Sequence, residues 1–234
     1  MISGLQKMTL LDYPGRVACT VFLQGCNYAC PFCHNSQLLS REGEAAMKRE
    51  DFLAFLKKRQ GLLDGVCVSG GEPTLQPDLE DFLRAIKAMG YAVKLDTNGS
   101  RPQVLKRLVE EGLVDYVAMD VKNCPRLYGQ TVGRENLNLA ATEESLKFLL
   151  SGKVDYELRT TLVIPFHDAK AVEEMGSWLI SLVPGTKPKR LYLQSFVDRE
   201  TVAFSGLSAP NTELLQEFSR ILSSCAEQVS IRNG

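Results

Sequence analysis

The sequence has no excess of charge of either sign and no apolar segment that suits a membrane. Lysine and arginine number 27 and aspartate and glutamate 28, so the net charge is −1 at pH 7. Such a balance gives no field that attracts nucleic acid or an anionic membrane. The first residues, Met1 to Lys7, lack the apolar region of a secretory signal peptide. We therefore expect no nucleic-acid or membrane partner and a reducing compartment, most simply the cytoplasm.

Histidine is scarce, and the cysteines do not suit a disulfide framework. An odd number of cysteines, seven, and the lack of a secretory signal both argue against disulfide pairing. Four of them are scattered, and we expect these to be small buried apolar residues: Cys19, Cys67, Cys124 and Cys225. The other three follow a strand-like run at the spacing C-x3-C-x2-C: Cys26, Cys30 and Cys33.

Three thiolates this close in sequence indicate a site for a soft metal. They leave one coordination position without a protein ligand, which on a 4Fe–4S cluster leaves one iron open to a small molecule. A zinc site completed by His34 is awkward, because His34 follows Cys33 directly and tetrahedral closure around one ion is then difficult. A ferredoxin-like carrier wants a fourth cysteine, and none lies at ferredoxin spacing. A zinc or electron-transfer module is thus the alternative to an enzyme.

The cysteine motif, with the aromatic Phe32 before its third cysteine, resembles that of the radical S-adenosylmethionine (SAM) superfamily. The wider context, the stretches Leu11–Gly15 and Gln24–Asn35, is most similar to one branch, the activating enzymes of glycyl-radical enzymes. Within that branch it resembles the activating protein of anaerobic ribonucleoside-triphosphate reductase. The similarity runs from about Leu5 to about Phe196, which is most of the chain.

This resemblance implies an activity, two cofactors and two protein partners. A 4Fe–4S cluster on Cys26, Cys30 and Cys33 would reductively cleave SAM to methionine and a 5′-deoxyadenosyl radical. The radical would install a glycyl radical on a partner enzyme, here the anaerobic ribonucleotide reductase, with a flavodoxin or ferredoxin-type protein as the electron donor. Nothing in the chain resembles a glycyl-radical loop of its own, so the acceptor is expected to be another protein.

The hydrophobic pattern predicts strands that alternate with helices about six times, which favours a parallel sheet with helical crossovers. Strands are expected at Val17–Phe22, Val66–Val68, Ala92–Leu95, Tyr116–Met119, Tyr156–Ile164, Arg190–Phe196 and, at the end, Val229–Ile231. Helices are expected at Arg49–Arg59, Pro77–Met89, Pro102–Gly112, Thr142–Gly152 with Thr142 as its cap, Ala169–Leu182 and Asn211–Cys225. A surface turn is expected at residues 41–43 and irregular chain at Asn123–Asn138.

A length of 234 residues suits a single domain, 1–234. A doubly wound sheet competes with a barrel, but polar residues gather at the carboxyl ends of successive strands, where barrel active sites are built. The resemblance implies an α/β fold, an open partial (βα)6 barrel of the TIM type with parallel strands and the cluster loop after strand 1.

The strand ends supply the candidate cofactor ligands. The stretch Ser69–Pro73 lacks the G-x-G-x-x-G pattern, and its two glycines allow backbone to approach a ligand closely. The resemblance implies that the methionine amino group of SAM contacts Gly70, Gly71 and Glu72. Asp96 and Asp120 lie at equivalent strand ends, and two carboxylates that converge on a site can bind ribose hydroxyls or a cation. The resemblance further implies that Asp96, Thr97, Asp120 and Lys122 serve the cofactor and a monovalent cation. An ordinary turn, helix caps and surface ion pairs are the structural alternatives.

Two further residues complete the predicted site. Arg159 lies in the middle of a strand, and an arginine that points inward there requires an anionic partner such as the cofactor carboxylate. Phe32 is expected to stack near adenine, with a plain core position as the alternative.

The chain departs from the pyruvate formate-lyase type of activase in one place. That type carries a histidine near the end of the strand that holds Leu193–Phe196, and none is here. The departure favours the reductase type and leaves the formate-lyase type as an alternative. A radical SAM enzyme acting on a small molecule, of the carboxy-deazaguanine synthase type, is another.

Overall fold

The computed structural model describes residues 1–40, 45–135 and 137–232, so the turn expected at residues 41–43 lies outside the described residues. The chain divides into two compact units, and the boundary falls inside one strand, β5 (Tyr116–Asp120). The first unit comprises Met1–Asn27, Gln37–Ala118 and Lys153–Asp155. The second comprises Tyr28–Ser36, Met119–Gly152 and Tyr156–Gly234. The prediction of one domain over the whole length therefore stays a prediction.

The first unit alternates strands with helices, as the sequence predicts. Its strands are β1 (Ile2–Thr9), β2 (Ala18–Leu23), β3 (Gly65–Gly70) and β4 (Ala92–Thr97). Its helices are α1 (Arg49–Lys57), α2 (Leu79–Ala88) and α3 (Pro102–Glu110), with a short 3-10 turn, η2 (Pro73–Leu75). A second such turn, η1 (Ser36–Leu38), lies across the unit boundary. The strands β2, β3 and β4 pair in parallel, and their side chains alternate between the two faces of the sheet.

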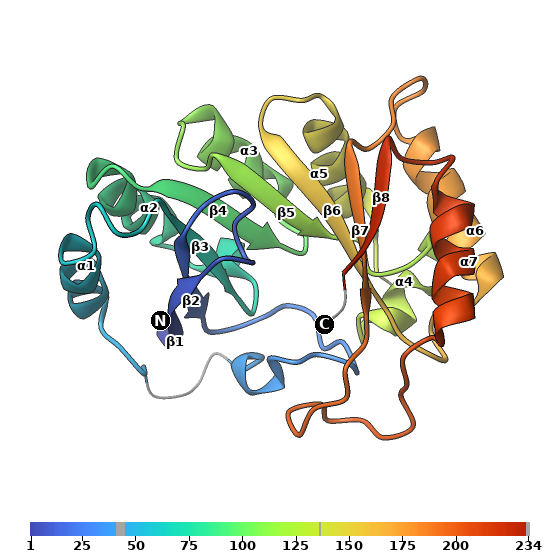
Figure 1. Ribbon diagram of the computed structural model, residues 1–234. Helices are drawn as coiled ribbons and strands as arrows, with labels where there is room; N and C mark the ends of the chain where they lie inside the picture. Colours follow the sequence, from blue (N-terminus) through green and yellow to red (C-terminus); the bar gives the residue numbers. More distant parts are fainter. Residues whose placement is uncertain (41–44, 136, 233–234) are drawn as a thin grey trace. The chain divides into compact units, whose positions relative to one another are not determined.

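The core of the first unit forms because apolar residues recur on one side of each helix. On α2, the side chains predicted to share a face are all buried: Leu79, Phe82, Leu83 and Ile86. Each fully buried leucine or phenylalanine contributes about 2 kcal/mol of hydrophobic stabilisation. In Figure 1 α1 lies next to α2, and α2 contacts β4. The buried face of α2 therefore packs at the strand that ends in Asp96 and Thr97.

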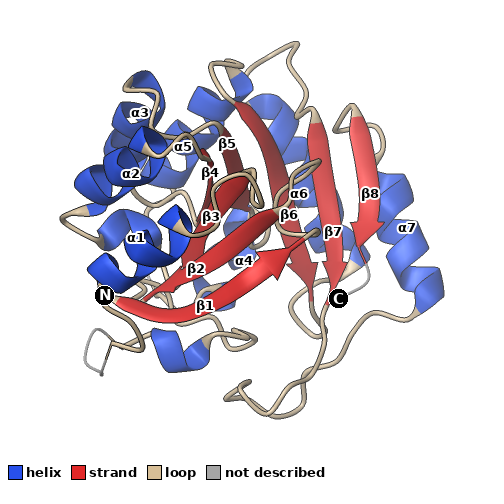
Figure 2. Cartoon of the chain, turned by 60° about the vertical axis from the view of Figure 1, so that its left-hand side comes forward, coloured by secondary structure: helices blue, strands red, loops and turns tan. Residues whose placement is uncertain are grey.

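The first strand of the chain was not expected from the sequence. β1 pairs with β2 in an antiparallel arrangement, side by side in both views (Figures 1 and 2). Three successive residues in its second half are exposed, Gln6, Lys7 and Met8, so it lacks the apolar signal of a strand. Backbone pairing with β2 holds it in place, and Gly4 lies opposite Phe22 of β2. The cluster loop consequently follows the second strand of the chain, and the first of the parallel ones.

The second unit continues the alternation. Its strands after the end of β5 are β6 (Asp155–Leu162), β7 (Arg190–Ser195) and β8 (Gln228–Arg232). Its helices are α4 (Pro125–Thr131), α5 (Ala140–Leu150), α6 (Ala169–Ser181) and α7 (Thr212–Leu222). β6, β7 and β8 pair in parallel, and α6 and α7 lie side by side next to β8 (Figure 1).

Two expectations about the second unit are wrong. The stretch expected to be irregular contains α4, in which Pro125 occupies the first turn and Tyr128 is fully buried. Seven residues, one of them a glycine, are too few to show helical periodicity in the sequence. Thr142, expected as a helix cap, lies inside α5 and is buried. The amide of Ala140 instead donates to Oδ1 of Asn138, which lies just before α5.

The strand order follows the order of the chain, from β1 to β8. Within the described residues this order has two ends, at β1 and at β8, so the sheet is not closed. The fold is α/β with a largely parallel, open sheet, as the sequence predicts.

Candidate active site

The cluster loop starts in the first unit, where backbone and side chains hold it at several points. The amide of Gly25 donates to the carbonyl oxygen of Leu38 at 2.7 Å, and that of Cys26 donates to Leu39 at 3.2 Å. These bonds fix the backbone at the first cysteine of the motif.

An asparagine beside that cysteine ties the loop to the segment after β4. Oδ1 of Asn27 accepts from Nδ2 of Asn98 at 2.9 Å, while its own Nδ2 donates to Oγ of Ser100 at 2.9 Å. The sequence did not indicate a role for these residues. The run Asp96-Thr97-Asn98-Gly99 signalled a strand end, but its pairing with Asn27 follows only from the fold.

Two glycines at the end of β3 are required because the backbone of the cluster loop passes over them. A Cβ on Gly70 would lie 2.3 Å from backbone atoms of Leu23, and one on Gly71 would lie 2.2 Å from the carbonyl oxygen of Gly25. Gly70 has a φ of 120°, which disfavours any other residue. The close approach that the sequence predicts here is made to the protein's own chain, while the contact with SAM stays a prediction.

Glu72 is buried and saturated by donors of the first unit. One of its oxygens accepts from the amide and hydroxyl of Thr74 and from Oγ1 of Thr97 at 2.8 Å. The other accepts from the amide of Asn98 at 2.6 Å. Burial raises the pKa of this carboxyl, although the four hydrogen bonds oppose the shift. Glu72 and the equally buried Thr97 therefore fasten the end of β3 to the end of β4.

Asp96, the candidate ribose or cation ligand at the end of β4, is engaged by side chains of the same unit. Nζ of Lys94 donates to its Oδ1, and Oγ of Ser69 donates to its Oδ2 at 3.0 Å. The lysine side chain is 1% exposed, whereas that of Asp96 is 14% exposed. A strand-interior lysine was not among the predicted site residues, because its spacing alone does not distinguish a buried side chain from an exposed one.

The rest of the cluster loop belongs to the second unit. The amide of Ala29 donates to the carbonyl oxygen of Val132 at 2.9 Å, and Gly133 has a φ of 64°. A Cβ on Gly133 would lie 2.4 Å from the carbonyl oxygen of Ala29. The next two cysteines are joined by a turn in which the amide of Cys33 donates to the carbonyl oxygen of Cys30 at 3.1 Å. The segment after α4 thus supports the loop, which the sequence did not reveal.

Phe32 and His34 anchor this part of the loop by burial. Phe32 packs against Val163 and Phe196 in a small apolar cluster, a core position that leaves adenine stacking as a prediction. Nε2 of His34 donates to the carbonyl oxygen of Val197 at 2.7 Å, and its ring stacks on Phe196. Burial lowers the pKa of His34, so the ring is neutral at pH 7.

A carboxylate at the end of β5 pairs with two cations, one just beyond that strand and one inside β6. Oδ2 of Asp120 accepts from Nζ of Lys122 and its Oδ1 from Nε of Arg159, both at 2.9 Å. The lysine and arginine side chains are 16% and 15% exposed. Burial alone would lower the pKa of Lys122, but Asp120 and the charge of Cys30 raise it above its ordinary value. Three of the predicted site residues are therefore brought together, and two of them are cations that an anionic ligand could reach.

A buried histidine supports this group from behind. Nε2 of His167 lies 3.0 Å from the carbonyl oxygen of Lys122, and its Nδ1 lies 3.1 Å from the amide of Val163. Burial lowers the pKa of His167, so the neutral ring donates from Nε2 and accepts at Nδ1. His167 fixes the backbone at Lys122, a role that the sequence did not indicate.

The cysteines fall into two sets. Those predicted to be core residues are buried, whereas the three of the motif are only partly buried, and none of the seven forms a disulfide. Across the described parts of the chain, no three side chains of the histidine, cysteine, aspartate or glutamate type form a ready metal site. Cys26 belongs to the first unit, and Cys30 and Cys33 belong to the second. Three partly buried thiols outside any disulfide, with no fourth cysteine at ferredoxin spacing, are a donor set that fits an iron–sulfur cluster with one open iron.

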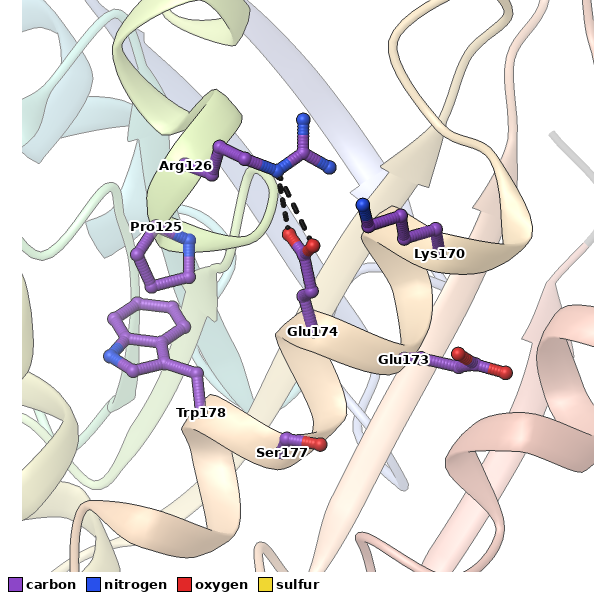
Figure 3. Close-up of a pocket in the computed structure, with 7 residues that line it drawn as sticks. All are labelled: Pro125, Arg126, Lys170, Glu173, Glu174, Ser177 and Trp178. Atoms are coloured by element: carbon purple, nitrogen blue, oxygen red, sulfur yellow. Dashed lines mark hydrogen bonds and ion pairs between the residues drawn. The ribbon is translucent and has the colours of Figure 1, made fainter.

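A hollow of about 590 Å³ lies elsewhere in the second unit, between α4 and α6 (Figure 3). One wall carries an ion pair in which Nε of Arg126 donates to Oε2 of Glu174 at 2.9 Å. Trp178 and Pro125 form the apolar side. None of the predicted site residues lines this hollow.

Comparison with known proteins decides the family. The sequence profile of the Radical SAM superfamily matches residues 20–179. This chain belongs to the radical SAM superfamily. It is an enzyme of that superfamily, and membership implies a 4Fe–4S cluster and SAM as cofactors. No helix in the described part of the chain is both long and apolar enough to cross a membrane.

Individual relatives refine this picture. The "Putative glycyl-radical enzyme activating enzyme MJ1227" of Methanocaldococcus jannaschii is 31% identical over 99% of this chain and 95% of its own length. The pyruvate formate-lyase-activating enzyme of Clostridium pasteurianum is 33% identical over 52% of each chain. The 7-carboxy-7-deazaguanine synthase of Koribacter versatilis is 34% identical over 62% of each chain. This chain therefore spans only part of the length of the latter two relatives.

The fold has relatives among solved structures as well. A radical SAM methyltransferase from Sphaerobacter thermophilus superposes with a TM-score of 0.70. The likeness covers 97% of this chain and 68% of that one at 16% identity, which shows a common fold alone. The expectation of an open barrel of the radical SAM type is confirmed.

Proposed function

We propose that this radical SAM enzyme installs a glycyl radical on a partner enzyme, the anaerobic ribonucleoside-triphosphate reductase. The observation that carries the proposal is the similarity to an activating enzyme along nearly the whole of both chains. The absence of a histidine at Leu193–Phe196 supports the reductase over pyruvate formate-lyase as the partner. A flavodoxin or ferredoxin-type protein is the proposed electron donor, and the cytoplasm the proposed compartment.

The chain's own residues divide the work of holding the cofactors. Cys26, Cys30 and Cys33 would ligate the cluster, and the other iron position would stay open for SAM. When bound, cluster and SAM supply a 5′-deoxyadenosyl radical by reductive cleavage of the cofactor. That chemistry would remove a hydrogen atom from a glycine Cα of the partner, with methionine and 5′-deoxyadenosine as the products of SAM. Lys122 and Arg159 present positive charge suited to the methionine carboxylate.

Other predicted contacts would bind the rest of SAM. The stretch of Gly70, Gly71 and Glu72 is proposed to contact the methionine amino group. Asp96 is proposed to bind the ribose, Thr97 to serve the cofactor beside it, and Phe32 to stack near the adenine. A monovalent cation near Asp96 and Asp120 belongs to the same prediction. Each of these carboxylates already pairs with a lysine of the protein.

The test is the appearance of a radical on the partner. The reconstituted enzyme, SAM and dithionite are incubated anaerobically with the reductase, and electron paramagnetic resonance records the product. A glycyl radical signal that requires all components is expected. The Cys30→Ala variant should give neither the signal nor 5′-deoxyadenosine, whereas Cys225→Ala, a buried cysteine outside the motif, should give both.

A second candidate is a radical SAM enzyme that acts on a small molecule. The match to a 7-carboxy-7-deazaguanine synthase over 62% of this chain favours it. If 5′-deoxyadenosine forms but neither the reductase nor pyruvate formate-lyase gains a radical, this second function is the correct one. A formate-lyase signal without a reductase signal would instead reassign the partner.

A further inference from the structure

The end of β4 holds a buried charge that the proposed function does not use. Lys94 lies inside the strand, two residues before Asp96, and its side chain is 1% exposed. The strand register places Cys67 of β3 beside Lys94. Since side chains alternate along a strand, Lys94 and Asp96 share one face of the sheet with Cys67 and Ser69.

The ammonium group is directed at the carboxylate on this face. Nζ of Lys94 donates to Oδ1 of Asp96 and lies 3.8 Å from Sγ of Cys67. Ser69 donates to the other oxygen of Asp96 at 3.0 Å. A buried ammonium is stable only when it is paired, so Lys94 and Asp96 fix each other's position.

This arrangement disagrees with a metal cation on Asp96. A cation such as potassium binds carboxylate oxygens with available lone pairs and away from other positive charges. At Asp96 a protein ammonium already holds one oxygen and a hydroxyl holds the other. An added cation would face the repulsion of Lys94 on the same carboxylate.

We propose that Lys94 is a built-in cation: its ammonium takes the place of a monovalent metal ion at Asp96 and orients this carboxylate for the ribose of SAM. Lys94 is thus a positioning residue, since it acts through Asp96. The orienting role rests on the proposed function, whereas the replacement of the metal ion does not.

The first experiment needs neither cluster nor SAM. The melting temperature of the full-length apoprotein is measured in potassium chloride and in tetramethylammonium chloride at equal ionic strength. The wild type should melt at the same temperature in both salts. Lys94→Gln should melt lower by about 6 °C in tetramethylammonium, as expected for the loss of about 2 kcal/mol, and potassium should restore most of that difference.

Two controls separate this effect from a general loss of charge. Lys87→Gln removes a lysine of the same unit that pairs with Asp115 near the surface at 2.7 Å, and it should show no potassium response. The double variant Lys94→Gln/Asp96→Asn removes both buried charges and should not respond to potassium either. A wild type that potassium stabilises would overturn the proposal. So would a Lys94→Gln variant that is unfolded or destabilised equally in both salts, because Lys94 would then be structural only.

The second experiment addresses SAM. The dissociation constant of SAM is measured by calorimetry on the reconstituted enzyme, and Lys94→Gln should weaken binding about tenfold in tetramethylammonium, with recovery in potassium. Unchanged binding would overturn the orienting role. If the wild type itself does not bind SAM, the proposed function fails, and the melting experiment still decides the role of Lys94.

Discussion

The two units carry the same pair of residues at a strand end, in opposite order. In the first unit Lys94 precedes Asp96 by two residues, and in the second Lys122 follows Asp120 by two. Lys94 therefore lies within β4 and is 1% exposed, whereas Lys122 lies beyond β5 and is 16% exposed. Lys94 is buried against its carboxylate, whereas Lys122 is still partly accessible to a ligand. The position of a charge relative to the strand end thus decides how far the charge is exposed.

The neighbourhoods of the two pairs differ in the same direction. Next to Asp96, Glu72 is buried and bonded to four donors of its own unit. Next to Lys122, Arg159 shares Asp120 and is itself partly exposed. The first unit therefore keeps its polar groups satisfied internally, and the second presents positive charge.

The buried polar network of the first unit is tested most strongly by Glu72→Gln. The amide would place a donor where the carboxylate accepts from Thr74, Thr97 and the amide of Asn98. We expect the free energy of unfolding to fall by about 3 kcal/mol, measured by urea denaturation. Glu80→Gln, which loses only an exposed ion pair with Arg107, should change it by less than about 1 kcal/mol. Equal effects of the two substitutions would contradict the idea that Glu72 belongs to a buried hydrogen-bond network.

The accessible side is tested by Lys122→Met. Asp120 keeps Arg159 as a partner, so the fold should be largely unaffected. The dissociation constant of SAM should rise about 30-fold, the loss of one charge-assisted hydrogen bond of about 2 kcal/mol. Calorimetry on the reconstituted enzyme measures it, with Lys187→Met, an exposed loop lysine, as the control. An unchanged constant would show that Lys122 does not contact SAM.

A substitution behind Lys122 sharpens the comparison further. His167→Leu keeps the size of the buried side chain but leaves the carbonyl oxygen of Lys122 without its donor. We expect a loss of about 1–2 kcal/mol in the free energy of unfolding and a smaller loss of SAM affinity than for Lys122→Met. Full stability with weakened binding would indicate a direct ligand role for His167 instead.

The smallest effect is the pH dependence that arises from the two histidines of the second unit. Burial lowers the folded-state pKa of His34 and His167 from the ordinary 6.5, so folding favours their neutral forms. Their contribution to stability is therefore complete above pH 6.5 and is lost as the pH falls below it towards the folded-state values. Urea denaturation at about pH 7.5 and about pH 5.5 should show this loss, and His167→Asn should reduce it. A loss unchanged in that variant would place its origin elsewhere.

Much of the fold was visible in the sequence because strands and helices alternate with clear apolar faces. The helix α2 and the buried strands β3 and β4 were predicted almost to their ends. The missed elements lack that signal: β1 is held by backbone pairing at an edge, and α4 is shorter than two full turns. A helix or strand is visible in a sequence through the periodicity of its apolar side chains, and these two segments show little of that periodicity.

The sequence by itself indicated the chemistry of this protein, because three cysteines at one spacing, with no fourth at ferredoxin spacing, predict a cluster with one open iron. It also placed Asp96, Asp120 and Lys122 at strand ends. Only the tertiary structure decided which polar groups make their hydrogen bonds within the protein itself. Burial and the approach of neighbouring strands turned Glu72 and Lys94 inward and left Lys122 and Arg159 partly open. Exposure depends on what packs against a residue, and that partner is distant in sequence.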